Sequence, residues 1–180
     1  GPVTTQLAGK ISNVAIPSVL RIINLSNNTC GTGFFHKSGV IITAEHVVSS
    51  CDAKDIVLIL STGIKVNVKS IIKDSKRDLA LLYPIDRLNL SALIISQAPM
   101  LAIGDQVATW GFPSGYRGFK PLLSVGYLSG DDQPGSEGSP RQWVINAAFN
   151  SGNSGGPVIR LEDGNVIGVV SSKLAPLPDS

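Results

Sequence analysis

The most informative segment of the sequence is Gly152-Asn153-Ser154-Gly155-Gly156-Pro157, a serine set between glycines in a chain of 180 residues. Glycines permit a tight turn in which backbone N–H groups point toward the serine oxygen. An acyl-transfer enzyme needs such donors, because its tetrahedral intermediate carries an oxyanion. Ser154 is therefore a candidate nucleophile, and the N–H groups of Gly152 and Ser154 are candidate oxyanion-hole donors. The alternative is an ordinary glycine-rich turn.

A serine hydroxyl is a weak nucleophile until a base removes its proton, and the chain has two histidines. His46 lies in Thr43-Ala44-Glu45-His46-Val47-Val48, directly after an apolar run. His36 lies in Phe35-His36-Lys37-Ser38-Gly39, which is typical of a solvent-accessible turn. We therefore predict that His46 is the base and that His36 has no part in the chemistry.

A base of this kind needs a carboxylate that holds the imidazole in the useful tautomer. Asp78 opens the apolar run 79–82, and an acid that enters a core segment needs a partner. The alternative is a surface aspartate paired with Arg77 or Lys76. Asp74 is the nearest competitor, but no apolar strand follows it directly. Asp78 is thus the predicted third member.

Short runs rich in Val, Ile and Leu, separated by Gly, Pro, Asn, Asp and Ser, predict an all-β protein. No segment shows three or four turns of helical apolar spacing, and 44–49 predicts one short helical turn. The polar stretch 130–140 is expected to be an exposed loop. Six candidate strands lie in the first half and five in the second, at 19–25, 30–36, 40–43, 56–60, 65–73 and 79–83, then 107–111, 122–128, 143–147, 156–160 and 166–171.

Composition excludes several classes of function. Hydrophobic residues make up 43% and charged residues 16%, and the net charge of +2 includes no basic stripe for a nucleic acid. The longest apolar runs, 56–60 and 92–95, are too short to span a membrane. The histidines and cysteines lack the close spacing of a zinc site. We therefore expect no metal, no cofactor, no nucleic acid partner and no membrane span.

The two cysteines, Cys30 and Cys51, flank the segment that carries His46. They are either free thiols or one disulfide that fastens this segment to its neighbouring strand. Both alternatives remain open, because the pairing of two positions is not given by their sequence alone. A bridge would favour the cell exterior or the periplasm, and the sequence otherwise leaves the compartment unassigned, with no signal peptide visible.

The order His, Asp, Ser in the strings TAEHVV, RDLALL and GNSGGP resembles the trypsin-like serine proteases, most closely the HtrA/Deg branch. The resemblance runs from about Gly31 to Ser172. The family implies two packed antiparallel β-barrels with the three residues between them. This places an N-terminal barrel at 1–85, a linker at 86–103 and a C-terminal barrel at 104–180. The segment 173–180 has no strand pattern, so the second barrel can lack its last strand.

The resemblance implies an endopeptidase that cuts polypeptides through an acyl-enzyme. Asn153 replaces the aspartate of the digestive enzymes, so their zymogen switch is not expected. No aromatic residue precedes Phe34, which predicts a monomer rather than the HtrA trimer. A catalytically silent module that binds peptides or acts as a scaffold is the alternative function. The family places the substrate pocket at Ala148, Phe149, Ser171, Ser172 and Lys173, and without an acid there small or medium apolar side chains are expected.

Overall fold

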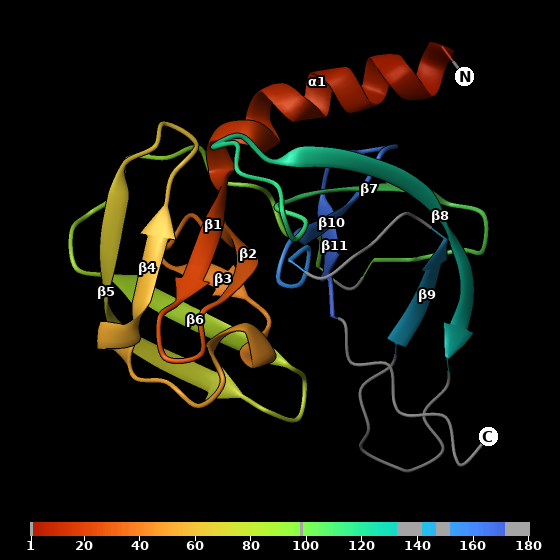
Figure 1. The fold of residues 1–180 in the computed structure, drawn as a ribbon. Coiled ribbons are helices and arrows are strands. Elements are labelled where there is room, and N and C mark those ends of the chain that lie inside the picture. Colours follow the sequence, from red (N-terminus) through yellow and green to blue (C-terminus); the bar gives the residue numbers. More distant parts are fainter. Residues whose placement is uncertain (1, 98, 133–141, 147–151, 172–180) are drawn as a thin grey trace.

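The computed structural model of the chain describes residues 2–97, 99–132, 142–146 and 152–171. Two β-structures lie side by side in Figure 1, and the helix α1 (Pro2–Ser18) extends across one end of the molecule over the second of them. Both β-structures are built from antiparallel neighbours, so the short apolar runs of the sequence pair mostly with runs close to them in the chain.

The first β-structure is a closed barrel in the order β1-β2-β3-β6-β5-β4. Closure satisfies the backbone groups that an open edge would expose. Alternate side chains of each strand enter the barrel, as the burial pattern of β5 shows around Val66 and Val68. Its strands are β1 (Val19–Asn24), β2 (Thr29–Phe35), β3 (Ile41–Thr43), β4 (Ile56–Ile59), β5 (Lys65–Asp74) and β6 (Leu79–Pro84).

The second β-structure is a five-stranded sheet in the order β11-β10-β7-β8-β9 over the described residues. It forms a half-barrel, and with the closed first barrel it confirms the predicted all-β, two-barrel fold class of the trypsin-like proteases. Its inner face is lined by apolar side chains that include Val107, Leu128 and Val158. Its strands are β7 (Gln106–Gly111), β8 (Leu122–Asp132), β9 (Gln142–Asn146), β10 (Pro157–Arg160) and β11 (Val166–Val169).

The sequence analysis did not predict helix α1, so the expectation that no segment forms a long helix is wrong. Its apolar spacing is weak because two of the buried positions, Ala8 and Ala15, are small. The helix gains its stability by packing on the second sheet, where these alanines contact the cluster around Trp110. The indole Nε1–H of Trp110 also donates to Ser12 Oγ at 2.9 Å. Tertiary contacts therefore outweigh a modest local signal.

Two other expectations differ in detail. The predicted helical turn at 44–49 is a 3₁₀ helix, η1 (Glu45–Val48), and a second one, η2 (Ala53–Asp55), precedes β4. Strand β8 continues to Asp132, so residues 130–132 of the predicted loop belong to a strand, and 133–140 lie outside the described residues. A polar sequence extends the strand here because β8 pairs with β9 as far as Asp132.

The segment between β6 and β7 runs along the second sheet. The Val166 N–H donates to the Ile94 carbonyl oxygen at 2.8 Å, and the Ser96 N–H donates to the Val166 carbonyl oxygen at 2.9 Å. Leu93 is buried in the cluster that also holds Trp110. The predicted linker at 86–103 thus packs against β11, while the division into 1–85, 86–103 and 104–180 stays a prediction.

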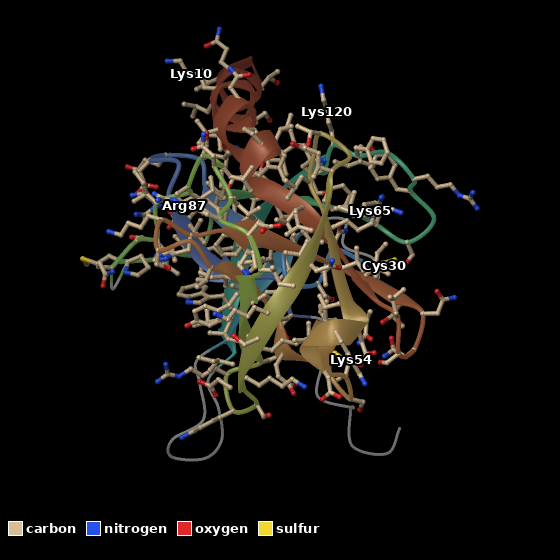
Figure 2. All side chains as sticks on the ribbon, turned by 90° about the vertical axis from the view of Figure 1, so that its left-hand side faces the viewer. Lys10, Cys30, Lys54, Lys65, Arg87 and Lys120 are labelled. Atoms are coloured by element: carbon tan, nitrogen blue, oxygen red, sulfur yellow. The ribbon has the colours of Figure 1, made fainter. Side chains whose placement is uncertain are left out.

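Charged side chains are distributed around the surface. The labelled side chains in Figure 2 lie apart from one another over the face that it shows. Within the described part of the chain, no helix combines the length and the apolar character needed to cross a membrane. The labelled basic residues are Lys10, Lys54, Lys65, Arg87 and Lys120.

Candidate active site

The serine turn owes its shape to two glycines. Gly152 has φ +97° and Gly155 has φ +89°, in the region that residues with a side chain rarely adopt. A Cβ on Gly152 would collide with the Phe112 carbonyl oxygen, and a Cβ on Gly155 would collide with the Thr32 carbonyl oxygen. Both positions therefore require glycine for conformation and for space. Ser154 lies between them and is 6% exposed.

The serine turn is fastened to both halves of the fold. The Thr32 N–H of β2 donates to the Ser154 carbonyl oxygen at 2.9 Å, and Thr32 Oγ1 donates to the Gly152 carbonyl oxygen at 2.7 Å. The Gly155 N–H donates to the Val170 carbonyl oxygen at 2.8 Å. A strand of the first barrel and the end of the second sheet therefore hold the turn from two sides.

His46 lies in η1, which follows β3 of the first barrel. Its Nδ1 is 2.8 Å from Asp78 Oδ2, and its backbone N–H donates to Asp78 Oδ1 at 3.0 Å. An ionised carboxylate only accepts hydrogen bonds, so Nδ1 carries the proton and Nε2 is left as the basic nitrogen. The structure thus brings the two residues that the sequence singled out into one hydrogen-bonded pair.

Asp78 precedes β6 with φ +54°, a left-handed conformation that aspartate tolerates better than most residues. Its carbonyl oxygen accepts the Glu45 N–H at 3.1 Å, and Oδ2 accepts the Ser171 hydroxyl at 2.6 Å. Burial alone would raise the pKa of the Asp78 carboxyl, but the hydrogen bonds from Ser171 and His46 outweigh it and lower this pKa below its ordinary value. The carboxyl is therefore ionised at neutral pH.

The serine turn approaches this pair through β3. Next to Gly155 lie the Thr43 hydroxyl and the Ala44 N–H, which directly precede Glu45 and His46 in the chain. On the other side, the Val170 carbonyl that holds Gly155 belongs to the residue before Ser171, which binds Asp78. Gly155 therefore contacts one segment two residues before His46 and another one residue before Ser171, the hydrogen-bond partner of Asp78.

The competing residues have other partners. Asp74 is exposed, accepts the Arg77 N–H at 3.2 Å and lies 3.8 Å from its Nε. His36 lies in its own turn, where Nδ1 is 2.7 Å from Ser38 Oγ. Neither forms a pair like that of His46 with Asp78.

The two cysteines are both free thiols, so the bridge that the sequence left open is not formed. Cys30, which is labelled in Figure 2, is exposed, and Cys51 is partly buried. Burial raises the pKa of the Cys51 thiol, whose Sγ lies 3.1 Å from the Val48 carbonyl oxygen. The thiols thus give no indication of an oxidising compartment. Among the described residues, no group of three or more His, Cys, Asp or Glu side chains is arranged to hold a metal ion.

The predicted substrate pocket falls mostly outside the described residues, which include Ser171 but not Ala148, Phe149, Ser172 or Lys173. Ser171 donates its hydroxyl to Asp78, a contact that sequence reasoning missed. Sequence reasoning also missed Thr32, whose hydroxyl binds the serine turn. Neither contact has a local signal, because each joins residues about 90 or more positions apart.

The fold and this arrangement define a trypsin-like protease domain, and comparison with known proteins agrees. The family described as "Trypsin-like peptidase domain" matches residues 31–169. The "Probable periplasmic serine endoprotease DegP-like" of Rhizobium meliloti is 31% identical over 148 residues, covering 81% of this chain and 28% of that protein. The "Periplasmic serine endoprotease DegP" of Escherichia coli K12 is 32% identical over 140 residues, covering 77% and 28%.

Among solved structures, the crystal structure of Deg5 superimposes with a TM-score of 0.75 at 26% identity, covering 94% of this chain and 86% of that one. The chain belongs to the trypsin-like peptidase family, and its domain is of the HtrA/Deg type. It spans 28% of the length of the two DegP relatives.

Proposed function

We propose that this domain is a serine endopeptidase in which Ser154 is the nucleophile, His46 the general base and Asp78 the residue that orients the histidine. The observation that carries the proposal is the hydrogen bonding of both Ser171 and His46 to the Asp78 carboxylate, next to the turn that holds Ser154. The names of the DegP relatives, which are serine endoproteases, support the same reaction.

The reaction follows from the proton positions. Nδ1–H of His46 points at Asp78, so Nε2 accepts the hydroxyl proton while Ser154 Oγ attacks the carbonyl carbon of the peptide bond. The N–H groups of Gly152 and Ser154 donate to the oxyanion. The intermediate then collapses to an acyl-enzyme as His46 returns the proton to the leaving amine. Water, activated by the same imidazole, hydrolyses the ester and regenerates the serine.

Asp78 contributes through its charge and its fixed position. Its carboxylate keeps the proton on Nδ1 and stabilises the imidazolium that forms when His46 accepts the proton of the serine. The Ser171 hydroxyl is a further donor, and it binds the same carboxylate oxygen as Nδ1 of His46. Because the pKa of Asp78 is lowered, this carboxyl does not take the proton itself.

The substrate is a polypeptide in this proposal. The pocket expected from the family resemblance has Ala148 at its base, and an acid that would neutralise arginine or lysine is lacking there in the sequence. An unpaired charge in such a pocket is strongly disfavoured. We therefore propose cleavage after small or medium apolar side chains such as Ala, Val or Leu. Cleavage of a peptide library mainly after Arg or Lys would overturn this specificity.

A fluorophosphonate probe tests the catalytic proposal directly, because it reacts with activated serines. Mass spectrometry should find the label on Ser154, and the Ser154→Ala chain should remain unlabelled. Ser38→Ala is the matched control, since Ser38 lies on an exposed turn with His36 and its loss should leave labelling unchanged. Absence of labelling in a folded wild-type chain under all conditions would instead support the silent peptide-binding module.

A further inference from the structure

The hydroxyl of Thr32 joins three segments from both halves of the fold. Thr32 lies in β2 of the first barrel and is 0% exposed. Its Oγ1 donates to the Gly152 carbonyl oxygen at 2.7 Å and accepts the Phe112 N–H, which follows β7, at 3.1 Å. A single buried oxygen thus satisfies one acceptor on the serine turn and one donor on the loop packed against it.

The same residue fixes two peptide planes of the serine turn. Its hydroxyl holds the carbonyl of Gly152, and its backbone N–H holds the carbonyl of Ser154. The carbonyl between them, that of Asn153, accepts the Gly156 N–H at 3.1 Å. Each carbonyl shares a planar peptide group with the N–H of the next residue. The three hydrogen bonds therefore set the directions of the N–H groups of Asn153, Ser154 and Gly155.

Gly152 is the residue that most needs such an anchor. With φ +97° and no side chain, its backbone can rotate more freely than that of any other residue type. The Thr32 hydroxyl, which belongs to the first barrel, donates the hydrogen bond that holds the Gly152 carbonyl. Loss of this bond would release the conformation of the glycine whose N–H is proposed to bind the oxyanion.

The loop on the other side of Thr32 cannot easily move to compensate. Arg21 of β1 is 8% exposed, and its Nη2 donates to the carbonyl oxygens of Tyr116 at 2.8 Å and Gly118 at 3.0 Å. Its guanidinium carbon lies 4.7 Å from the centre of the Phe112 ring. A buried cation bound to these groups keeps Phe112 in place. A chain without the Thr32 hydroxyl would therefore lose the hydrogen bonds that the Phe112 N–H and the Gly152 carbonyl make with it among the described residues.

We infer that Thr32 is a positioning residue for the oxyanion hole: its buried hydroxyl holds the Gly152 carbonyl and thereby restricts the rotation of Gly152, whose N–H is one of the proposed donors. The inference rests on the proposed function, since it assigns Thr32 a part in that reaction. The bound substrate carries no oxyanion, which develops on the way to the tetrahedral intermediate, so the effect of Thr32 should fall on kcat rather than on KM.

The test compares Thr32→Val, which keeps the branched shape without the hydroxyl, with Thr32→Ser, which keeps the hydroxyl. Thr32→Val should lower kcat on a peptide substrate by about 10- to 100-fold with KM within about twofold, somewhat less than complete loss of an oxyanion donor. Thr32→Ser should stay within about threefold of wild type because its hydroxyl can make both bonds. A peptide aldehyde, which forms a tetrahedral adduct on the serine, should lose affinity for Thr32→Val by the same factor as kcat.

Thr109→Val is the matched control. Thr109 lies in β7 and is 2% exposed, but its hydroxyl has no hydrogen-bond partner among the described residues. Removing that hydroxyl should leave kcat, KM and aldehyde affinity unchanged. Should Thr32→Val fail to fold, Thr32→Cys supplies the comparison, because a thiol is only a weak donor and acceptor.

An unchanged kcat in a folded Thr32→Val chain would overturn the inference, as would an equal loss in Thr32→Ser and Thr32→Val. The proposed function fails separately, if wild type is no more active than Ser154→Ala. In that case the amide exchange rate of Phe112 still decides whether the Thr32 hydroxyl holds this part of the structure in place. Faster exchange in Thr32→Val than in Thr32→Ser supports it, and equal exchange rejects it.

Discussion

The first barrel closes on itself, with β1 paired to both β2 and β4, whereas the second sheet ends at β9 and β11 over the described residues. The histidine and the aspartate come from the closed half. Thr43 pairs with Ala80 across β3 and β6, and His46 and Asp78 lie just outside this ladder. The geometry of the pair is therefore set by neighbouring strands of one barrel.

The serine is held in a different way. Its turn precedes β10 in the open sheet and takes its conformation from Gly152 and Gly155. Its turn is held by hydrogen bonds with Thr32 in the other half and with Val170, the residue after β11. The proposed base and its carboxylate are therefore assembled within one half, while the proposed nucleophile depends on contacts between the halves.

Removing the nucleophile or the base should have equally large effects, although the two lie in different halves. Ser154→Ala and His46→Ala should each lower kcat by about 10⁶-fold, because the members of such a triad act as a unit. Both chains should keep the wild-type circular dichroism spectrum and melting temperature within a few degrees. Steady-state hydrolysis of a peptide substrate measures the effect, and a difference of several orders of magnitude between the two variants would contradict a shared mechanism.

Changing the carboxylate tests the pair within the first barrel. Asp78→Asn should lower kcat by about 10⁴-fold, because an amide cannot hold the proton on Nδ1 in the way a carboxylate does. Asp74→Asn is the matched control: Asp74 lies four residues earlier, is exposed and contacts Arg77, so its change should leave kcat within about twofold. Damage from Asp74→Asn with a harmless Asp78→Asn would reverse the assignment.

A methyl group added to the serine turn should disturb the turn while leaving the His46–Asp78 pair of the first barrel intact. Gly155→Ala places a Cβ against the Thr32 carbonyl oxygen and also forces φ +89° on a residue with a side chain. We expect a loss of unfolding free energy of about 3 kcal/mol or more and no probe labelling of Ser154. Gly104→Ala has φ +94° with open space around the Cβ, and should cost only about 1–2 kcal/mol with labelling intact.

The control isolates steric collision from backbone strain, since both glycines share a positive φ. Denaturant unfolding and the probe give the two readouts. The His46–Asp78 pair should persist in Gly155→Ala, and its NMR signals should remain in the positions seen in wild type. Equal effects of the two alanine variants would show that the fit between the halves matters less than backbone conformation.

Much of the fold could be predicted because its signals are local. Strand positions followed from short apolar runs, and the short helical turn predicted at 44–49 corresponds to η1. Helix α1 could not be predicted in this way, because Ala8 and Ala15 become informative only when Trp110 packs on them. The end of β8 was not predicted for a similar reason, because its polar residues are held in the strand by pairing with β9.

For the candidate site the sequence identified residue types that carry chemistry but not the residues that hold them. Asp78 stood out because an acid opens an apolar strand, and it lies beside His46 in the structure. Thr32 and Ser171 have no such mark, since serine and threonine are common in strands and loops. Their importance depends on contacts with Gly152 and Asp78, residues 120 and 93 positions away.

The smallest expected effect concerns the Ser171 hydroxyl, which links the second half to the carboxylate of the first. The pKa of Asp78 is lower in the folded chain than the ordinary value of about 3.9 that an unfolded chain would have. The ionised carboxyl therefore stabilises the fold above that ordinary value, and this stabilisation is lost as the pH falls through the folded pKa. Ser171→Ala removes a donor to the carboxylate, which raises the folded pKa of Asp78 and shrinks this contribution.

We expect Ser171→Ala to lower the unfolding free energy by about 1.5–3 kcal/mol at pH 7, as for a hydrogen bond to a charged group, and by much less at a pH below the folded pKa of Asp78, where the carboxyl is protonated in both states. Urea unfolding at a series of pH values, in the Ser154→Ala background to prevent self-cleavage, measures this. Ser12→Ala is the control, because it removes only a neutral hydrogen bond from Trp110, and its cost should not vary with pH. Parallel losses for both variants through the acid range would show that Ser171 supports the fold without acting on the charge of Asp78.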